Sequence, residues 1–124
     1  MLLFEQITIS GGYIVCNWKK VYKKWHTYEK LDSGIRGQLN VLSNNEMALE
    51  DAFYKNLTFG TGGMRGIIGP GSNRMNIYTI RKAVSGLATY LLENRVNVKD
   101  RGVVIAYDSR HMSADFALEA VKVF

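Results

Sequence analysis

The sequence predicts an α/β fold in which a mixed sheet is sandwiched between helices. One continuous apolar run, VVIAY at residues 103–107, is typical of a strand that is covered on both faces. The segments around it place apolar residues at helical spacing, and no internal repeat or low-complexity tract interrupts this alternation. A chain of 124 residues is long enough for one domain that buries roughly 65% of its unfolded surface.

Two helices are predicted before residue 60. Asn17 is expected to cap the first, which ends near residues 32–34, and its core-facing side chains recur at helical spacing. These are Trp18, Val21, Tyr22, Trp25 and Tyr28. Ser43 and Glu46 have the spacing of a capping box, which predicts a second helix ending near Asn56. Its apolar side would be formed by Met47, Leu49, Ala52 and Phe53.

A third helix is predicted to begin at Asn76, after loop residues at 70–73. Its apolar side would be formed by Ile77, Ile80, Val84, Leu87 and Leu91. Residues 99–102 predict a turn before the strand at 103–107, and residues 108–112 predict a loop after it.

Ser113 is expected to cap a fourth helix, whose inward side chains repeat at helical spacing. These are Phe116, Ala117, Ala120, Val121 and Phe124. No glycine, proline or basic last turn follows this helix. We therefore expect a fragment, or one domain of something longer, truncated at its C-terminal end.

Composition narrows the class of protein. Hydrophobic residues make up 47% of the chain and charged residues 22%, which favours a globular protein over a disordered one. The apolar runs are too short to span a bilayer, and the N-terminus lacks the features of a secretory signal. The single cysteine, Cys16, is typical of an inert thiol in a reducing compartment. We expect a cytoplasmic protein.

The net charge of +5 favours an anionic partner, and its distribution is uneven. Residues 1–60 carry seven Lys and Arg against six Asp and Glu, whereas residues 61–124 carry nine against five. The surplus therefore lies in the half that contains most of the glycine cluster described next. The lysine pairs at 19–20 and 23–24 are interpreted as a solvated helix face rather than a nucleic-acid contact.

Six of the twelve glycines lie between Gly60 and Gly71, and we call these residues, 60–71, the glycine cluster. Backbone without Cβ atoms can adopt positive φ and present its N–H groups to an anion. Arg65 adds a planar fork of donors that suits two phosphate oxygens, and Thr61 adds a hydroxyl. The cluster predicts a phosphate site, with a purely structural pair of turns as the alternative.

Two familiar phosphate loops do not fit this stretch. It has no Gly-Lys-Ser/Thr, and glycines 60, 62 and 66 miss the G-x-G-x-x-G spacing. A second candidate is YDSRHMS at residues 107–113, because ligands gather at the carboxyl ends of strands in open α/β sheets. There Asp108 and Arg110 could pair with each other or brace Arg65, or Asp108 could simply satisfy loop amides.

No other catalytic or metal-binding pattern is evident. His111 and His26 have no partner at catalytic spacing and are interpreted as surface residues, with packing as the alternative for His26. The sequence contains no zinc-like or calcium-like cluster of His, Cys, Asp and Glu, and no nucleophile elbow.

Three motifs together resemble a known family. FGTGGMRG, SNRMNIYTIRKAVSGLATYL and YDSRHMSADFA, in this order, resemble the first domain of the α-D-phosphohexomutases, in the phosphoglucomutase and phosphopentomutase branch. The resemblance covers about residues 17–124. It implies the N-terminal domain of a four-domain cytoplasmic enzyme, an intramolecular phosphotransferase that interconverts hexose 1-phosphate and hexose 6-phosphate. It also implies a phosphoserine donor, Mg²⁺, and glucose 1,6-bisphosphate as intermediate or activator.

The resemblance also implies roles for individual residues. Thr61, Gly62, Gly63 and Arg65 would bind the substrate, with Arg65 as the catalytic residue in contact with phosphate. Asp108 and Arg110 would support that wall of the site from behind. Expected partners are a sugar phosphate and the remaining domains of the enzyme, with no nucleic acid and no membrane.

Two loops that the resemblance implies do not occur in these 124 residues: a Thr-Ala-Ser-His-Asn-Pro type serine loop and an Asp-Gly-Asp-Gly-Asp metal loop. We therefore expect the metal ligands to lie outside this chain and the chain alone to be inactive. Residues 1–16 match nothing in the family and are expected to be a leader of unknown role, with an artificial extension or a strand of unknown role as the alternatives. A stand-alone anion-binding or nucleic-acid-binding module is the alternative, and an inactive regulatory or assembly domain is a third.

Overall fold

The computed structural model describes residues 8–10, 13–15 and 17–124. They fall into two compact units, Met1–Met75 and Asn76–Phe124, and each is described here by itself. None of the helices in the described part of the chain has the length and hydropathy needed to cross a bilayer.

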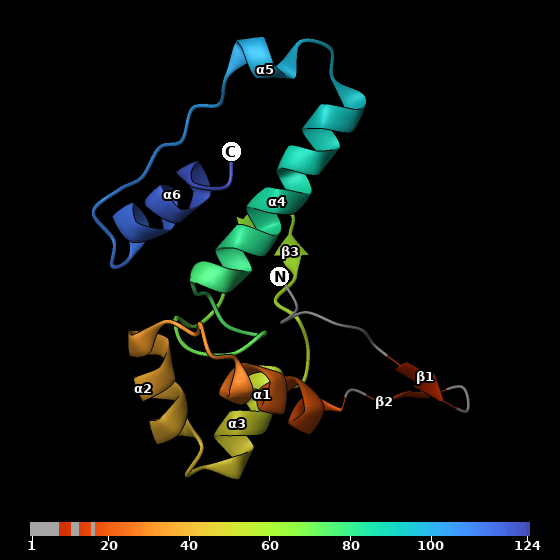
Figure 1. Cartoon of the computed structure of the whole chain (residues 1–124), viewed down its shortest axis with the longest axis vertical. Coiled ribbons are helices and arrows are strands. Elements are labelled where there is room, and N and C mark those ends of the chain that lie inside the picture. The colour runs from red at the N-terminus through yellow and green to blue at the C-terminus, as the bar shows by residue number, and fades with distance from the viewer. Residues whose placement is uncertain (1–7, 11–12, 16) are drawn as a thin grey trace. The chain divides into compact units, whose positions relative to one another are not determined.

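Three helices pack together in the first unit: α1 (Trp18–Thr27), α2 (Ser33–Leu42) and α3 (Glu46–Phe53) (Figure 1). Their core is built around Trp25 and Phe53, whose rings meet edge to face with centroids 5.6 Å apart. Leu39 of α2 and Ala52 of α3 are fully buried beside them. The prediction that the aromatic stripe of the first helix contributes to a core is therefore confirmed at Trp25.

The predicted boundary of the first helix was wrong. α1 begins at its predicted cap, Asn17, but ends at Thr27, and Asp32 instead caps the unpredicted helix α2. The Oδ1 atom of Asp32 accepts a hydrogen bond from Ile35 N at 3.0 Å. Ser33 and two glycines make this stretch resemble a loop. Burial of Ile35 and Leu39 outweighs that low helix propensity, because tertiary packing supplies most helical stability.

The predicted cap of α3 was also wrong. Asn45, not Ser43, accepts the hydrogen bond from Ala48 N, at 3.1 Å. Ser43 instead donates its hydroxyl to Asn40 O within the end of α2. The helix ends at Phe53 rather than near Asn56. Leu49, Ala52 and Phe53 face the core as predicted, but Met47 is 81% exposed.

Two short antiparallel pairs complete the strands of the first unit. β1 (Thr8–Ser10) pairs with β2 (Tyr13–Val15), and β3 (Phe59–Gly60) pairs with β4 (Gly63–Met64). Cys16 lies outside the described residues. The interpretation of residues 1–16 as a leader stays a prediction.

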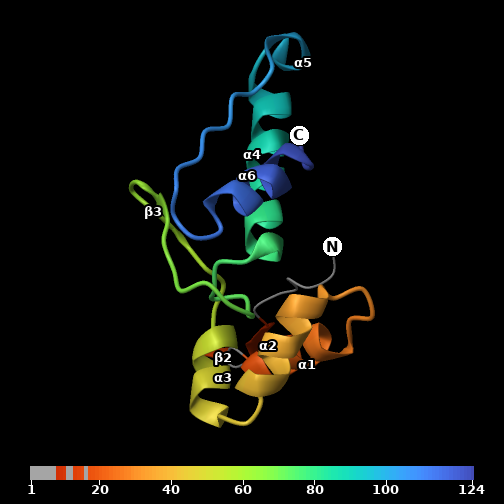
Figure 2. The same ribbon diagram turned by 90° about the vertical axis from the view of Figure 1, so that its left-hand side faces the viewer.

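The second unit contains α4 (Ile77–Asn94), α5 (Val98–Arg101) and α6 (Ser113–Val121). Helix α4 begins where predicted: Asn76 accepts hydrogen bonds from Tyr78 N and Thr79 N, and the Thr79 hydroxyl accepts from Asn76 N. Helices α4 and α6 lie side by side (Figures 1 and 2). The turn predicted at 99–102 forms as the short helix α5, which ends at Arg101 and is followed by Gly102 with φ +67°.

The buried strand predicted at 103–107 is not formed. These residues belong to no sheet, and Val104 is 96% exposed. A strand obtains its hydrogen bonds from a neighbouring strand, and the described part of the second unit provides none. The described residues therefore show helices and two small antiparallel sheets rather than one mixed sheet.

Helix α6 differs from its prediction in detail. Met112 precedes the helix with φ +61° and makes no side-chain cap, while the Ser113 hydroxyl accepts a hydrogen bond from Asp108 N at 3.2 Å. Ala120 is buried as predicted. Val121 and Phe124 were predicted to face inward but are about half exposed, because the single neighbouring helix in this unit covers only one side of α6.

Candidate functional site

Strands β3 and β4 form a hairpin, residues 59–64, at the start of the glycine cluster. Phe59 pairs with Met64 and Gly60 with Gly63, so Thr61 and Gly62 make a two-residue turn. Gly63 has φ +119°, which side chains rarely adopt, and this position therefore requires glycine. Figure 2 shows the hairpin projecting away from the three helices of the first unit.

A pocket of about 390 Å³ lies at this hairpin. It brings together all four residues that were expected to bind substrate: Thr61, Gly62, Gly63 and Arg65. Two further residues, Thr58 and Gly60, also line it and were missed. Thr58 lies opposite Arg65 when the observed hairpin register is extended by one residue beyond Phe59 and Met64, and the sequence alone does not show this register.

Arg65 is exposed in this pocket and makes no hydrogen bond or ion pair with any described residue. In contrast, Arg74, Arg81 and Arg110 each contact a carboxylate. The guanidinium of Arg65 can therefore present both of its prongs to an anion from outside. The hydroxyls of Thr58 and Thr61 likewise make no hydrogen bond to the described residues, which leaves two neutral donors beside one fixed cation.

The glycine cluster also has a structural role further along. Gly71 has φ +126°, and a Cβ atom placed on it would lie 2.4 Å from the carbonyl oxygen of Ala52. Glycine is therefore required there by close packing against α3. The two interpretations of the glycine cluster, a phosphate site and a structural pair of turns, apply to different parts of it. The hairpin end forms an open pocket, and the Gly71 end forms a packed turn.

Residues 56–124, more than half of the chain, match the family model described as phosphoglucomutase/phosphomannomutase, alpha/beta/alpha domain I. The chain belongs to this family. The match begins just before the hairpin and includes the pocket, so the pocket is part of the family's domain I. It also establishes the α/β class of the domain, although the mixed sheet is not formed by the described residues.

Curated relatives agree with the family. The chain is 46% identical over 67 residues to a phosphoglucomutase of Staphylococcus aureus strain bovine RF122 / ET3-1, and 44% identical over 68 residues to that of Staphylococcus haemolyticus. It is 41% identical over 73 residues to the phosphoglucomutase of S. aureus strain MRSA252. These segments cover 54, 55 and 59% of the chain but only 12, 12 and 13% of the respective relatives. No solved structure gave a significant match.

The second predicted cluster of this phosphohexomutase domain lies in the loop before α6. The Oδ1 atom of Asp108 accepts from Arg110 N at 3.0 Å, and its Oδ2 atom accepts from Arg110 Nε at 2.8 Å. The backbone N–H of Arg110 is the main cause that lowers the pKa of Asp108, supported by the Arg110 and Ser113 side chains. Asp108 therefore both satisfies a loop amide and pairs with Arg110. That this pair braces Arg65 stays a prediction, and His111 is exposed beside it.

The family resemblance implies Mg²⁺, whose ligands in proteins are mainly carboxylate and carbonyl oxygens and water. Throughout the described ranges, no group of three or more His, Cys, Asp and Glu side chains lies close enough to hold a metal ion. The expectation that the Mg²⁺ ligands lie outside this chain stays a prediction.

Proposed function

We propose that the chain is the N-terminal part of a phosphoglucomutase-like enzyme and that the hairpin pocket binds the phosphate of its substrate, a hexose phosphate. One observation carries the proposal: Arg65 lines a glycine-walled pocket and contacts no carboxylate. Arg74 and Arg81 each pair with a carboxylate and Arg36 binds two helix carbonyls, whereas the guanidinium of Arg65 faces the pocket without any such partner among the described residues.

The geometry suits phosphoryl transfer, in which an enzyme mainly positions the phosphate and stabilises its charge. The fork of Arg65 would bind two phosphate oxygens, while the Thr61 hydroxyl and the exposed backbone N–H of Gly62 would donate to the remaining oxygen. Thr58 would donate from the opposite side of the hairpin. These residues bind and orient, and none of them can act as the phosphoryl donor.

The complete reaction would interconvert hexose 1-phosphate and hexose 6-phosphate through a phosphoserine and a bisphosphorylated sugar such as glucose 1,6-bisphosphate. The 124 residues contain no Ser-His-Asn loop to carry the phosphoryl group. The proposal therefore assigns the donor serine, the Mg²⁺ ligands and the sugar-selecting contacts to other domains, in a four-domain cytoplasmic enzyme. The chain by itself is expected to bind sugar phosphate weakly and not to turn it over.

Titration of the ¹⁵N-labelled chain with glucose 1-phosphate tests the binding step. We expect the amide signals of Gly60, Gly62 and Gly63 to shift, and Arg65→Lys to weaken the apparent affinity about tenfold, because an ammonium cannot bridge two oxygens. Arg101→Lys is the matched control, because Arg101 is also exposed but lies outside the pocket. Unshifted hairpin amides at millimolar sugar phosphate would contradict the proposal.

A chimera tests the activity. Residues 56–124 would replace the matched segment of the Staphylococcus haemolyticus phosphoglucomutase, with glucose 1-phosphate as substrate. We expect measurable turnover that Arg65→Ala reduces by about two orders of magnitude. Titration of the chain with duplex DNA examines the alternative: saturable binding that weakens steeply with salt, together with an inactive chimera, would favour a nucleic-acid-binding module.

A further inference from the structure

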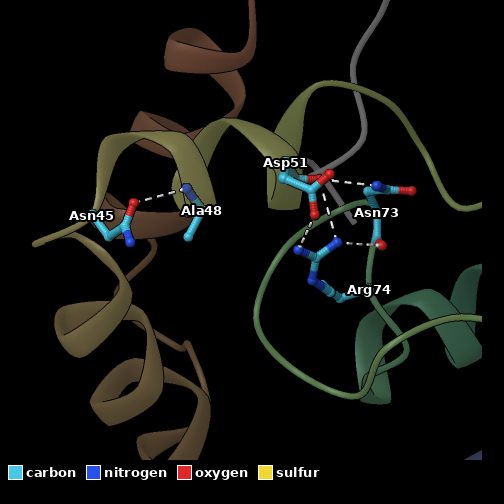
Figure 3. A network of polar contacts seen from close by, with 5 residues as sticks. All are labelled: Asn45, Ala48, Asp51, Asn73 and Arg74. Carbon is cyan, nitrogen blue, oxygen red and sulfur yellow. Dashed lines mark hydrogen bonds and ion pairs between the residues drawn. The ribbon is translucent and has the colours of Figure 1, made fainter.

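The end of helix α3 is closed by residues from beyond the hairpin. Arg74 contacts Asp51 twice, with 2.5 Å between Nη2 and Oδ2 and 3.3 Å between Nη1 and the carbonyl oxygen. The side-chain amide of Asn73 donates to the same carbonyl at 2.9 Å, and Asn73 N donates to Ala52 O at 3.0 Å. Figure 3 shows this network at one end of α3 and the Asn45 cap at the other. Two carbonyls that the helix leaves without intrahelical partners are thereby satisfied.

Residues 72–75, which we call the anchoring segment, hold both ends of the hairpin. On the incoming side, Leu57 N donates to Ser72 O at 2.7 Å. On the outgoing side, Met75 N donates to Ile67 O at 2.8 Å, and Gly69 N donates to Met75 O at 3.1 Å. The Ser72 hydroxyl, which is buried, donates to Lys55 O at 2.8 Å. The hairpin is therefore tied to the anchoring segment two residues before Phe59 and two residues after Arg65.

The two sides of the hairpin are also packed against each other below the pocket. A Cβ atom placed on Gly66, the residue after Arg65, would lie 2.8 Å from a methyl carbon of Leu57. The Leu57 side chain fills the space beside Gly66, and a side-chain carbon of Met75 in the anchoring segment lies 3.6 Å from the same position. These contacts link the anchoring segment to the backbone that carries Arg65.

We infer that Arg74 and Asp51 are positioning residues that fix the direction of the Arg65 side chain through the anchoring segment. The part of the inference that concerns ligand affinity rests on the proposed function. Arg74 suits this role because its guanidinium donates to three oxygens. Two belong to Asp51, in its carboxylate and its carbonyl, and the third is Asn73 O at 3.2 Å. The Arg74 side chain is only 12% exposed, whereas the carboxylate of Asp51 is on a side chain that is 58% exposed, so the arginine is the shielded member of the pair. A cation at the C-terminus of α3 is also favoured by the helix dipole.

The same unit offers a matched control. Arg36 closes the end of helix α1, donating from Nη1 to His26 O at 3.2 Å and from Nη2 to Tyr28 O at 2.6 Å. It resembles Arg74 in chemistry and in its place beside a helix C-terminus, but it has no hydrogen bond to the anchoring segment. A purely structural effect should therefore be shared by both arginines, whereas an effect on the hairpin should belong to Arg74.

The experiment compares Arg74→Lys, Asp51→Asn and Arg36→Lys in the ¹⁵N-labelled chain. We expect Arg74→Lys and Arg36→Lys to lower the melting temperature. Only Arg74→Lys and Asp51→Asn should shift the Gly60, Gly62 and Gly63 amides, speed their hydrogen exchange, and weaken glucose 1-phosphate binding about tenfold. Asp51→Glu, which keeps the carboxylate, should leave the hairpin amide signals closer to those of the unmodified chain than Asp51→Asn does.

Two results separate this inference from the proposed function. If the unmodified chain binds no sugar phosphate, the proposed function fails. The role of Arg74 is then still decided by the amide chemical shifts and hydrogen-exchange rates of the hairpin in Arg74→Lys. The positioning role is overturned if the chain binds sugar phosphate but Arg74→Lys has no more effect than Arg36→Lys. The two quantities to compare are the chemical shifts of the hairpin amides and the affinity for glucose 1-phosphate. If Arg74→Lys unfolds, the comparison rests on Asp51→Asn, which removes the charge pair and keeps the side-chain shape.

Discussion

Glu119 of α6 accepts a hydrogen bond from Arg81 of α4, with 2.7 Å between Nε and Oε2, and this contact joins the two long helices of the second unit. Its other oxygen, Oε1, accepts from Lys122 Nζ at 2.6 Å. The Glu119 side chain is 10% exposed, so both of its oxygens are satisfied by cations at a largely buried position.

This contact predicts that the second unit loses stability in acid. The hydrogen bond from Lys122, and then that from Arg81, hold the pKa of Glu119 below its usual value of 4.5. A carboxylate with a depressed pKa stabilises the fold at pH values above its unfolded pKa. This stabilisation is lost as the pH falls through the folded pKa. Glu119→Gln should cost about 1 to 3 kcal/mol at neutral pH and flatten the decline below pH 4.5, followed by circular dichroism. Asp115→Asn, on the exposed side of α6, is the control.

Glycine substitutions should separate the packed and open parts of the glycine cluster. Gly71→Ala should cost at least about 2 kcal/mol, because the new methyl group overlaps the Ala52 carbonyl and φ is positive. Gly62→Ala meets nothing within 4 Å and should leave stability nearly unchanged. Urea denaturation measures both. Equal destabilisation by the two variants would contradict the division of the cluster that is described above.

Helix α4 should depend on its cap. Asn76 is buried and accepts two backbone hydrogen bonds, so Asn76→Ala should cost about 1 to 2 kcal/mol. Asn76→Ser should cost less, because a hydroxyl can still accept. Amide hydrogen exchange along α4 measures the loss, and Asn94→Ala, at the exposed end of the same helix, serves as the reference.

The loop before α6 should loosen when Asp108 loses its charge. Its pKa is lowered chiefly by the N–H of Arg110, so the order that it supplies is present above its usual pKa of 3.8 and is lost as the pH falls. We expect Asp108→Asn to speed hydrogen exchange at Arg110 and to leave the melting temperature almost unchanged, because the loop is exposed. A large drop in melting temperature would show that this loop is coupled to the helices.

Local signals predicted part of the fold: the caps expected at Asn17 and Asn76 are formed, and those expected at Ser43 and Ser113 are not. Asn17 and Asn76 cap helices as expected, because an N-cap is made by residues within four positions of one another. Helix α2 was missed because its glycines argue against a helix, and only its packing against α3 explains it. The strand prediction at 103–107 was wrong for a related reason: an apolar run indicates burial, but a strand also needs a hydrogen-bonded neighbour, which the run itself does not reveal.

The candidate site shows the same limit. The glycines and Arg65 were found because positive φ and a guanidinium fork leave marks on the sequence, and the structure places the predicted residues of the hairpin in one pocket. The contacts of Asp51 with Asn73 and Arg74 span more than twenty residues, and no periodicity connects them. Residues that position a site through long-range contacts therefore leave little signal in a single sequence.

The separation between the anchoring segment and the turn at Thr61 and Gly62 bears on how such a loop evolves. Residues that secure the loop are distinct from those that face solvent at its tip. Substitutions at the tip can therefore arise without preventing the chain from folding. A lineage can alter what the loop recognises while it inherits the same scaffold.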